Sequence, residues 1–320
     1  MQKSPKFRGL AGRTKRTLTR SYTQTQIINT LDDHTQKINE ALFFIHRLKN
    51  GLTVRTGEFE ALTALFTGQK MYVDTRDISV APHLMLDGIW EPEITKVYRS
   101  LIKRDSIVID VGANFGYFGI VAGTTVEHEG GVYFIEANNT FMPYIRKSVA
   151  VNGMEDIATI SNIGIGDKDS SLELQLMGDY WGSSSFSDSQ VTGSRERFDI
   201  SDTRSKTVKV TTLDSYCLRY KIDHIDILKV DIEGFEEAAY SGMKRIIKQS
   251  PNMKLLLEFT PASYKNPEKF YNKIIKDFKF VYAINQAGEL KSISTYNQLA
   301  AITEEHGWSM ILAMKTPFVA

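Results

Sequence analysis

One short stretch, VIDVGANFGYFG at residues 108–119, has residue types and spacing that could bind a nucleotide cofactor. Apolar and β-branched residues lead into Asp110, and Gly112, Asn114 and Gly116 then follow at alternate positions. A strand that ends in a glycine turn and begins a helix lets backbone N–H groups approach a ligand closely. The alternative is a tight strand–helix turn that binds nothing.

The charge and the glycine spacing of this turn indicate which cofactor it holds. The dinucleotide pattern Gly-x-Gly-x-x-Gly would need glycine where Asn114 and Tyr117 stand. Asp110 would repel a pyrophosphate but attract the ammonium and sulfonium groups of S-adenosylmethionine. Glu136 ends the next strand and could accept hydrogen bonds from both ribose hydroxyls. We therefore predict S-adenosylmethionine as the cofactor, with a nicotinamide-dependent oxidoreductase as the alternative.

A second set of ionisable residues stands at the ends of two later strands. LKVDIEGFE places Lys229, Asp231, Glu233 and Glu236 around one strand end, and LLLEF places Glu258 at the end of the next. Burying unpaired carboxylates is costly, so this repetition suggests a common polar site. Three uses compete: Asp231 or Glu233 as general base for a hydroxyl, a divalent ion held by Asp231 and Glu258, or positioning of cofactor and substrate. The structural alternative is an ion-paired strand end with acids at a helix N-terminus. We predict no metal centre.

Residues 76–93, RDISVAPHLMLDGIWEPE, could fold over the methyl-transfer site. His83 is a further candidate base because an unperturbed histidine titrates near pH 6.5, although a lone histidine is often structural. Trp90 could stack on a sugar or anchor the next helix. The WGSSSF loop after Tyr180 could close over the acceptor or be a plain flexible loop.

The elements that must position these residues form an alternating pattern from Ser106 onward. Apolar strands separated by helices predict a parallel sheet covered on both faces, with ligands at the carboxyl ends of the strands. The expected strands are SIVID, VYFIEA, ATISNIGI, IDILKVDI and MKLLLEF. Before this region we expect a helix in FEALTALF, a strand in KMYVD and a helix from Glu93 to Lys103.

The N-terminal residues have a different character. Residues 1–21 are basic without any acid, so we expect a disordered solvated tail, with weak contact to anionic lipid as the alternative. Residues 22–52 repeat Leu31, Ile38, Ile45 and Leu52 every seven positions. This heptad stripe predicts a helical arm that either packs on the main body or forms a homo-oligomer.

Composition limits the classes of function. The net charge of +1 does not indicate a nucleic-acid partner, and the single cysteine, Cys217, allows neither an internal disulfide nor a cysteine-based metal site. No apolar run reaches the roughly 18 residues of a membrane span, and the N-terminus lacks an apolar signal core. We expect a cytoplasmic protein, in weak peripheral contact with the membrane if the tail binds lipid.

Seven segments in a fixed order resemble one known family. VIDVGANFGYFG, FIEAN, IGIGDKDSSLEL, GSSSF, VKVTTLDSY, IDILKVDIEGFE and LLLEF together resemble the FkbM-type S-adenosylmethionine-dependent methyltransferases over about residues 75–315. The resemblance implies an α/β, Rossmann-like class I methyltransferase sheet of seven strands, the last antiparallel. It also implies O-methylation of a sugar in a surface polysaccharide or glycolipid, or of a related small molecule.

The resemblance also assigns residues. It carries over Asp110, Gly112, Asn114, Gly116 and Glu136 as cofactor contacts, and places Asp167 near the adenine. Asp231 as a cofactor contact or base is inferred from the residues alone. We divide the chain into a tail (1–21), an arm (22–52), a cap or substrate region (53–105) and a methyltransferase domain (106–320). A non-catalytic partner subunit that keeps the cofactor fold is a further alternative.

Overall fold

The computed structural model describes residues 34–35, 37–39, 52–187, 191–193, 195, 203–304 and 306–318. The chain divides into two compact units, Met1–Ile45 and His46–Ala320. In the first unit only five helical residues are described, among them the exposed Ile38. The predictions for the tail and for most of the arm therefore lie outside the described residues. No described helix has the length and apolar character that crossing a membrane requires.

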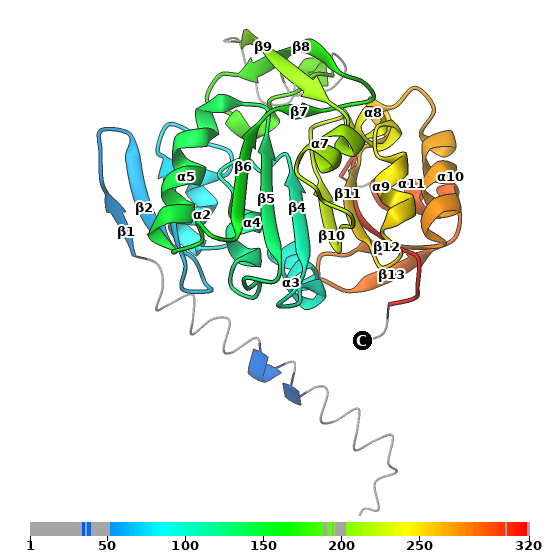
Figure 1. The fold of residues 1–320 in the computed structure, drawn as a ribbon, viewed down its shortest axis with the longest axis horizontal. Coiled ribbons are helices and arrows are strands. Elements are labelled where there is room, and N and C mark those ends of the chain that lie inside the picture. Colours follow the sequence, from blue (N-terminus) through cyan, green and yellow to red (C-terminus); the bar gives the residue numbers. More distant parts are fainter. Residues whose placement is uncertain are drawn as a thin grey trace, which may run out of the picture. The chain divides into compact units, whose positions relative to one another are not determined.

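An eight-stranded sheet forms the centre of the second unit (Figure 1). Its strand order is β13-β12-β14-β11-β10-β4-β5-β6. Five adjacent strands, β6, β5, β4, β10 and β11, run parallel to one another. Strand β14 lies between β11 and β12 and is antiparallel to both. The bounds are β4 Ile107–Val111, β5 Gly131–Glu136, β6 Ala158–Asn162, β10 Ile227–Val230, β11 Lys254–Phe259, β12 Phe280–Ile284, β13 Leu290–Ile293 and β14 Ser309–Met314.

This arrangement confirms the mostly parallel sheet of seven strands with an antiparallel last strand. The additional strand, β13, pairs antiparallel with β12 at the edge. All residues of β10 and β14 are buried, as expected for strands covered on both faces. The parallel strands end together, which brings the residues after β4, β5, β10 and β11 to one edge of the sheet.

Helices cover both faces of this sheet (Figure 1). One face packs against α7–α11 in a single apolar cluster, while α4 contacts β4 and β5. The helices are α2 Ala81–Asp87, α3 Pro92–Leu101, α4 Tyr117–Ala122, α5 Met142–Val151, α7 Leu213–Arg219, α8 Glu236–Ser241, α9 Lys244–Gln249, α10 Pro267–Phe278 and α11 Tyr296–Thr303, with 3-10 turns η1 Asn139–Phe141, η2 Trp181–Ser183 and η3 Pro261–Ser263.

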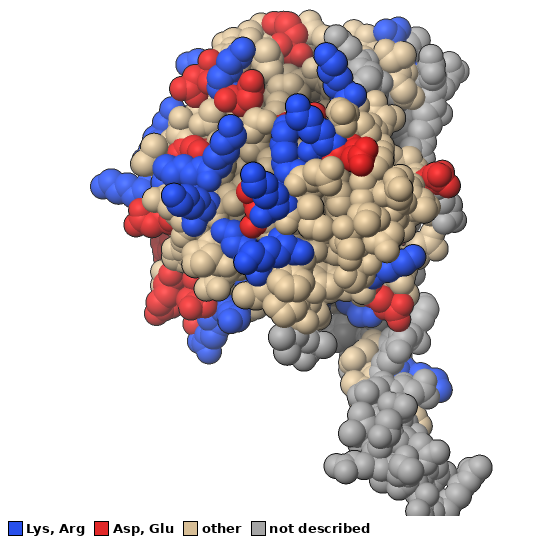
Figure 2. All heavy atoms as spheres, turned by 90° about the vertical axis from the view of Figure 1, so that its right-hand side faces the viewer, with Lys and Arg blue, Asp and Glu red and all other residues tan. Residues whose placement is uncertain are grey.

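Helix α10 shows how the outer layer is built. Its apolar side chains are buried against the sheet: Phe270, Tyr271, Ile274 and Phe278. The exposed lysines of α9 and α10 are Lys244, Lys248, Lys269 and Lys276. Figure 2 shows lysine and arginine side chains spread over the side of the molecule where these helices lie. The charged face is therefore the solvated side of an amphipathic helix.

Two expectations for secondary structure were wrong. FEALTALF forms a strand, β2 (Glu60–Ala64), which pairs antiparallel with β1 (Thr53–Arg55) and with β3 (Lys70–Asp74) in a separate sheet. Strand pairing and the alternate burial of Ala61 and Thr63 override the helix propensity of alanine, leucine and glutamate. The strand in KMYVD and the helix that begins at Pro92 are confirmed.

The segment GFEEAAYSGMKRIIKQ forms two helices, α8 and α9, separated at Gly242. A Cβ atom on Gly242 would lie 2.1 Å from the carbonyl oxygen of Gly166, so the chain bends where the two backbones meet. ATISNIGI likewise divides into β6 and β7 (Gly164–Ile165). Strand β7 joins β9 (Thr203–Thr211) and β8 (Ser170–Met177) in a third sheet.

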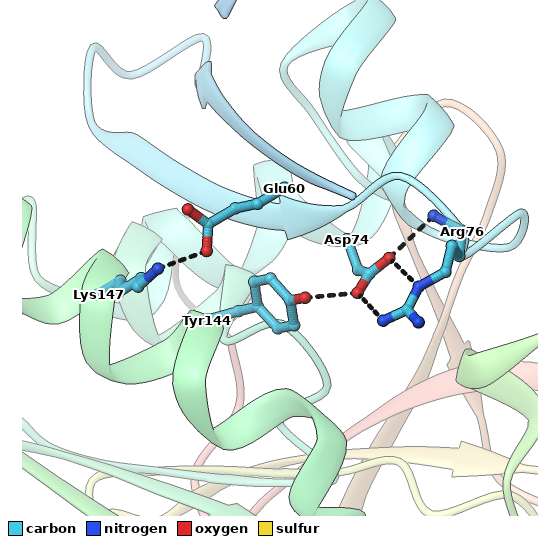
Figure 3. Close-up of polar contacts among 5 residues, drawn as sticks. All are labelled: Glu60, Asp74, Arg76, Tyr144 and Lys147. Carbon is cyan, nitrogen blue, oxygen red and sulfur yellow. Dashed lines mark hydrogen bonds and ion pairs between the residues drawn. The ribbon is translucent and has the colours of Figure 1, made fainter. Parts of the chain in front are cut away.

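The N-terminal sheet is attached to α5 through a buried carboxylate (Figure 3). Asp74 accepts hydrogen bonds from the Arg76 guanidinium at 2.9 and 2.7 Å and from the Tyr144 hydroxyl. Burial acts to raise the pKa of Asp74, but the hydrogen bonds from Arg76 and Tyr144 outweigh it and leave the pKa lowered. A second ion pair joins Lys147 Nζ to Glu60 Oε2 at 2.5 Å, and both of these side chains are more exposed than that of Asp74.

Candidate functional site

The glycine turn after β4 lies against the end of β10. Gly112 has a φ of +83°, and a Cβ atom there would lie 1.7 Å from the carbonyl oxygen of Asp231. The backbone N–H groups of Gly112 and Ala113 both donate to the carbonyl of Ile135 at 2.9 and 3.1 Å. Only glycine can occupy position 112, because any other side chain would displace the next strand end.

Asn114 continues this turn in the left-handed region, with a φ of 52°. Its Oδ1 accepts from the N–H of Phe115 at 2.7 Å, which stabilises a conformation that asparagine tolerates better than most residues. Gly116, at φ +89°, is the N-cap residue that precedes α4. The polar residue at the place of a dinucleotide glycine is therefore a structural part of the turn.

Glu136 at the end of β5 is tied to the same turn. Its Oε2 accepts from the N–H of Asn114 at 2.8 Å, and its Oε1 accepts from the N–H of Asn138 at 2.7 Å. Burial raises the pKa of Glu136 to about 7, although these backbone hydrogen bonds oppose the rise. A cavity of about 50 Å³ lies beside it, lined by Gly112, Asn114, Glu136, Asp231 and Glu233 among others.

A larger cavity of about 610 Å³ adjoins this one and shares Gly112, Asn114, Gly182, Asp231 and Glu233 with it. The chain segments that form its wall are far apart in the sequence. They contribute, among others, His83, Trp90, Glu91, Phe118, Lys229, Asp231, Glu233, Glu258, Thr260 and Trp308. The structure thus brings the predicted catalytic residues Asp231, His83 and Glu233 to one cavity beside the glycine turn.

Lys229 is a buried cation that lines this cavity among several carboxyl groups. Its side chain is 3% exposed, and its Nζ forms an ion pair with Asp231 Oδ2 at 2.7 Å and lies 4.5 Å from the centre of the Phe118 ring. Burial acts to lower the pKa of Lys229, but Asp231, Asp110 and Glu91 outweigh it and raise the pKa. Lys229 therefore remains protonated and neutralises part of the surrounding carboxylate charge.

Asp110 lies beneath the glycine turn rather than on a cavity wall. It is 1% exposed, and neither carboxylate oxygen has a hydrogen-bond partner among the described residues. In the sheet it stands beside Lys229 on β10. Burial raises the pKa of Asp110 to about 6, against the opposing charge of Lys229. Its contact with the cofactor stays a prediction, and so does that of Gly116, which lines neither cavity.

The remaining predicted residues take different positions. His83 is exposed, and its ring meets Trp90 edge-on at 5.1 Å. Glu233 has a φ of 54°, and its carbonyl accepts from the Ser185 hydroxyl at 2.5 Å. Asp167 is exposed and lines a separate hollow with Ser187 and Gly234, so its place near the adenine stays a prediction.

Glu236 has the structural role proposed as the alternative for this motif. Its Oε1 accepts from the N–H groups of Ile232 and Gly234 at 3.0 and 3.1 Å, and its Oε2 accepts from the Tyr264 hydroxyl at 3.0 Å. Its carboxylate therefore holds the turn after β10 in shape.

Residues 179–182 are held over the glycine turn by residues 76–81. Asp77 is 1% exposed, and its carboxylate accepts from the N–H groups of Val80, Ala81 and Trp181 at 2.8, 2.7 and 3.2 Å. Ser79 Oγ accepts from the N–H of Gly182 at 3.0 Å. The Trp181 ring stacks on Phe115 at 6.3 Å. The WGSSSF loop is therefore attached to the cap and contributes to both cavities.

Two groups at this site were given no role from the sequence. Glu91 and Thr260 line the larger cavity, and each has a buried side-chain oxygen without a hydrogen-bond partner in the described structure. Thr260 is 8% exposed. The only available signals were the polar residues in GIWEPE and the position of Thr260 just after β11. Among the described residues, no group of three or more His, Cys, Asp or Glu is arranged to hold a metal ion.

These features fit S-adenosylmethionine better than a dinucleotide. The turn admits close approach at Gly112, Asn114 stands where a pyrophosphate site needs glycine, and carboxylates surround the adjoining cavities. Anionic groups favour a ligand with ammonium and sulfonium charges.

Two solved structures are similar to this chain at low sequence identity. The methyltransferase FkbM from Methylobacillus flagellatus KT is 16% identical, with a TM-score of 0.40 over 67% of this chain and 47% of its own. The O-methyltransferase from Bacillus cereus in complex with SAH is 10% identical, with a TM-score of 0.39 over 69% of this chain and 81% of its own. The chain thus spans about half the length of the first structure. No curated protein matches the sequence.

The sequence match to a family is more extensive. The methyltransferase FkbM domain matches residues 110–288, which is more than half of the chain. The matched range contains the glycine turn, Glu136, Asp231, Glu258 and Thr260. It confirms the resemblance to the FkbM-type methyltransferases, and the chain belongs to the FkbM methyltransferase family.

Proposed function

We propose that the protein methylates a hydroxyl group of a sugar, either in a surface polysaccharide or glycolipid or in a related small molecule. The observation that carries this proposal is the composition of the larger cavity. Trp90 and Trp308 line it together with the carboxyl groups of Glu91, Asp231 and Glu258. Aromatic rings pack on the C–H faces of a sugar, and carboxylates accept hydrogen bonds from its hydroxyls.

The chain's own residues hold and orient the two reactants. Gly112 and Asn114 would allow close backbone approach to the cofactor, and Glu136, which lines the smaller cavity, would accept hydrogen bonds from the ribose hydroxyls. The ion pair of Asp231 and Lys229 balances charge where the cavities adjoin. S-adenosylmethionine, when bound, supplies a methyl group already activated by the sulfonium charge. Much of the rate then depends on the proximity and orientation that this site provides.

Transfer of a labelled methyl group tests this proposal. The protein is incubated with isotopically labelled S-adenosylmethionine and a panel of methyl glycosides, with simple amines and thiols as controls. We expect label in the glycosides alone, and mass spectrometry should place it on a ring hydroxyl. Transfer only to an amine or thiol would contradict hydroxyl acceptors. Calorimetric binding of S-adenosylmethionine without transfer to any probe would favour the non-catalytic partner subunit.

Three associated predictions concern the whole chain. They are the cytoplasmic location, weak contact of the basic tail with anionic lipid, and a homo-oligomer formed through residues 22–52. The tail and most of the arm lie outside the described residues, so these stay predictions.

A further inference from the structure

One carboxyl group in the larger cavity comes from the cap rather than from the sheet. Glu91 lines the cavity, and its Oε2 is buried without a hydrogen-bond partner among the described residues. Its backbone is left-handed, with φ 44° and ψ 68°. Such a conformation is strained for a glutamate and persists where its surroundings determine it, commonly at functional sites.

The backbone around Glu91 is fixed to the helix that follows the glycine turn. The N–H of Thr95 donates to the Glu91 carbonyl at 2.8 Å, and the Thr95 hydroxyl donates to the Trp90 carbonyl at 2.7 Å. The Thr95 hydroxyl also lies 3.1 Å from the hydroxyl of Tyr117, the first residue of α4. Glu91 is therefore held in place relative to the residues that surround the cofactor.

The earlier candidates for a base are less suited to the task. Oδ2 of Asp231 is already occupied by the ion pair with Lys229 Nζ at 2.7 Å. His83 is exposed and lies edge-on to Trp90 at the rim. Glu91, in contrast, has a buried oxygen that can still accept a proton from a ligand.

Charged groups around Glu91 determine its basicity. Burial raises its pKa, as do the charges of Asp231 and Glu93, whereas Lys229 lowers it. Glu258 lines the same cavity, and its raised pKa reflects burial and then its acidic neighbours, Glu91 among them. His83 and His306 also line the cavity. A carboxylate in such surroundings is a stronger base than one in water.

We infer that Glu91 is the catalytic base that takes the proton from the acceptor hydroxyl, and that Thr260 helps to orient that hydroxyl. This inference rests on the proposed function. As the hydroxyl oxygen bonds to the methyl carbon and the carbon–sulfur bond breaks, the electron pair of that bond stays on sulfur. The proton passes to Oε2 of Glu91 and then to solvent.

Three proteins test this role: the wild type, Glu91→Gln, and Glu93→Gln as a matched control from the same helix that does not line the cavity. The probes are labelled S-adenosylmethionine, the methyl glycoside panel, and S-adenosylhomocysteine for binding. We expect Glu91→Gln to bind S-adenosylhomocysteine within about twofold of wild type and to lose about 10²–10⁴-fold in kcat. It should also lose the rise of kcat with pH. Glu93→Gln should keep its kcat and that rise, with the midpoint of the rise moved to lower pH, because the charge of Glu93 raises the pKa of Glu91.

The possible outcomes distinguish a failure of the proposed role of Glu91 from a failure of the proposed methyl transfer to sugars. Wild-type transfer that Glu91→Gln retains, with the same pH profile, overturns the role of Glu91 and leaves the proposed function intact. Absence of wild-type transfer to every glycoside overturns the proposed function and the role of Glu91 together. Thr260→Val should raise KM for the glycoside more than it lowers kcat, and an unchanged KM would overturn the role of Thr260.

Discussion

At the scale of single residues, Gly112 illustrates how one position joins two strand ends. Its φ of +83° disfavours side chains, and the nearby carbonyl of Asp231 leaves no space for one. Gly68 and Gly153 also have positive φ values, but nothing lies within 4 Å of a Cβ atom built on either. Substitutions at these three glycines therefore distinguish the cost of a left-handed backbone, which all three share, from the cost of a close contact, which only Gly112 has.

We predict that Gly112→Ala destabilises the fold by about 4 kcal/mol or more, because both effects act there. Gly68→Ala and Gly153→Ala should each cost only about 1–2 kcal/mol, the penalty of the left-handed conformation. Urea unfolding of the three variants measures the difference. Equal losses in all three would show that contact with β10 does not constrain position 112.

Residue types predicted the strand–turn–helix unit around Gly112 well, but they did not point to Glu91 as a base. Glycine spacing and a carboxylate at the end of β5 are visible in one dimension, because the strand–turn–helix unit is local. The buried state of Asp110 depends on the side chains that pack around it, and no local pattern shows it. The left-handed conformation of Glu91 has no signature in its residue type.

At the scale of elements, the Asp77 carboxylate determines where the WGSSSF loop lies. It joins the start of α2 to Trp181, and Ile78 donates from its N–H to the Asp179 carbonyl at 3.0 Å. The serine-rich composition of this loop is typical of a flexible loop, but several hydrogen bonds attach it to the cap. The composition could not show this attachment, because the partner residues are about 100 positions away in the sequence.

We predict that Asp77→Ala releases this loop. Removing the carboxylate leaves several backbone N–H groups without acceptors, which should cost about 2–3 kcal/mol of stability. Amide hydrogen exchange of residues 179–184 should become faster, and affinity for S-adenosylhomocysteine should fall about tenfold or more. Asp169→Ala is the control, because that exposed carboxylate accepts one side-chain hydrogen bond, from Thr211 at 2.6 Å. Unchanged exchange in the loop would refute the attachment.

Pairing between elements also explains why the helix predicted in FEALTALF was wrong. Its apolar residues fit a helical period as well as a strand period, and only pairing with β3 decides between them. The parallel strands were predictable because their apolar runs are longer and are separated by clear helices. The antiparallel direction of β14 followed from the family resemblance. Its place between β11 and β12 was not predicted, since strand order is set by contacts distant in sequence.

At the scale of the whole molecule, buried carboxyl groups link stability to pH. The pKa of Asp110 is raised to about 6 and that of Glu136 to about 7, in both cases mainly by burial. A carboxyl group with a raised folded pKa stabilises the protein fully below its unfolded pKa, near 4. That contribution is lost as pH rises through the folded value.

We therefore predict that the ligand-free protein loses stability between about pH 4 and pH 7. Asp110→Asn should reduce the slope between about pH 4 and pH 6, by about 3 kcal/mol in total, since one pKa unit corresponds to about 1.4 kcal/mol. Denaturant unfolding at several pH values measures this effect. The control is Asp105→Asn, at an exposed position before β4. If Asp110→Asn and wild type have parallel profiles, the buried Asp110 carboxyl does not titrate as described.

All three tryptophans of the chain belong to the two cavities: Trp181 lines the smaller one, and Trp90 and Trp308 line the larger. Indole emission depends on the polarity and contacts of the ring, so the entire tryptophan fluorescence of this protein originates beside its ligands. Cofactor and acceptor can therefore be followed in stopped-flow experiments without an attached dye. Replacing one tryptophan at a time with phenylalanine would assign each spectral change to one cavity, and would reveal in which order the two ligands enter.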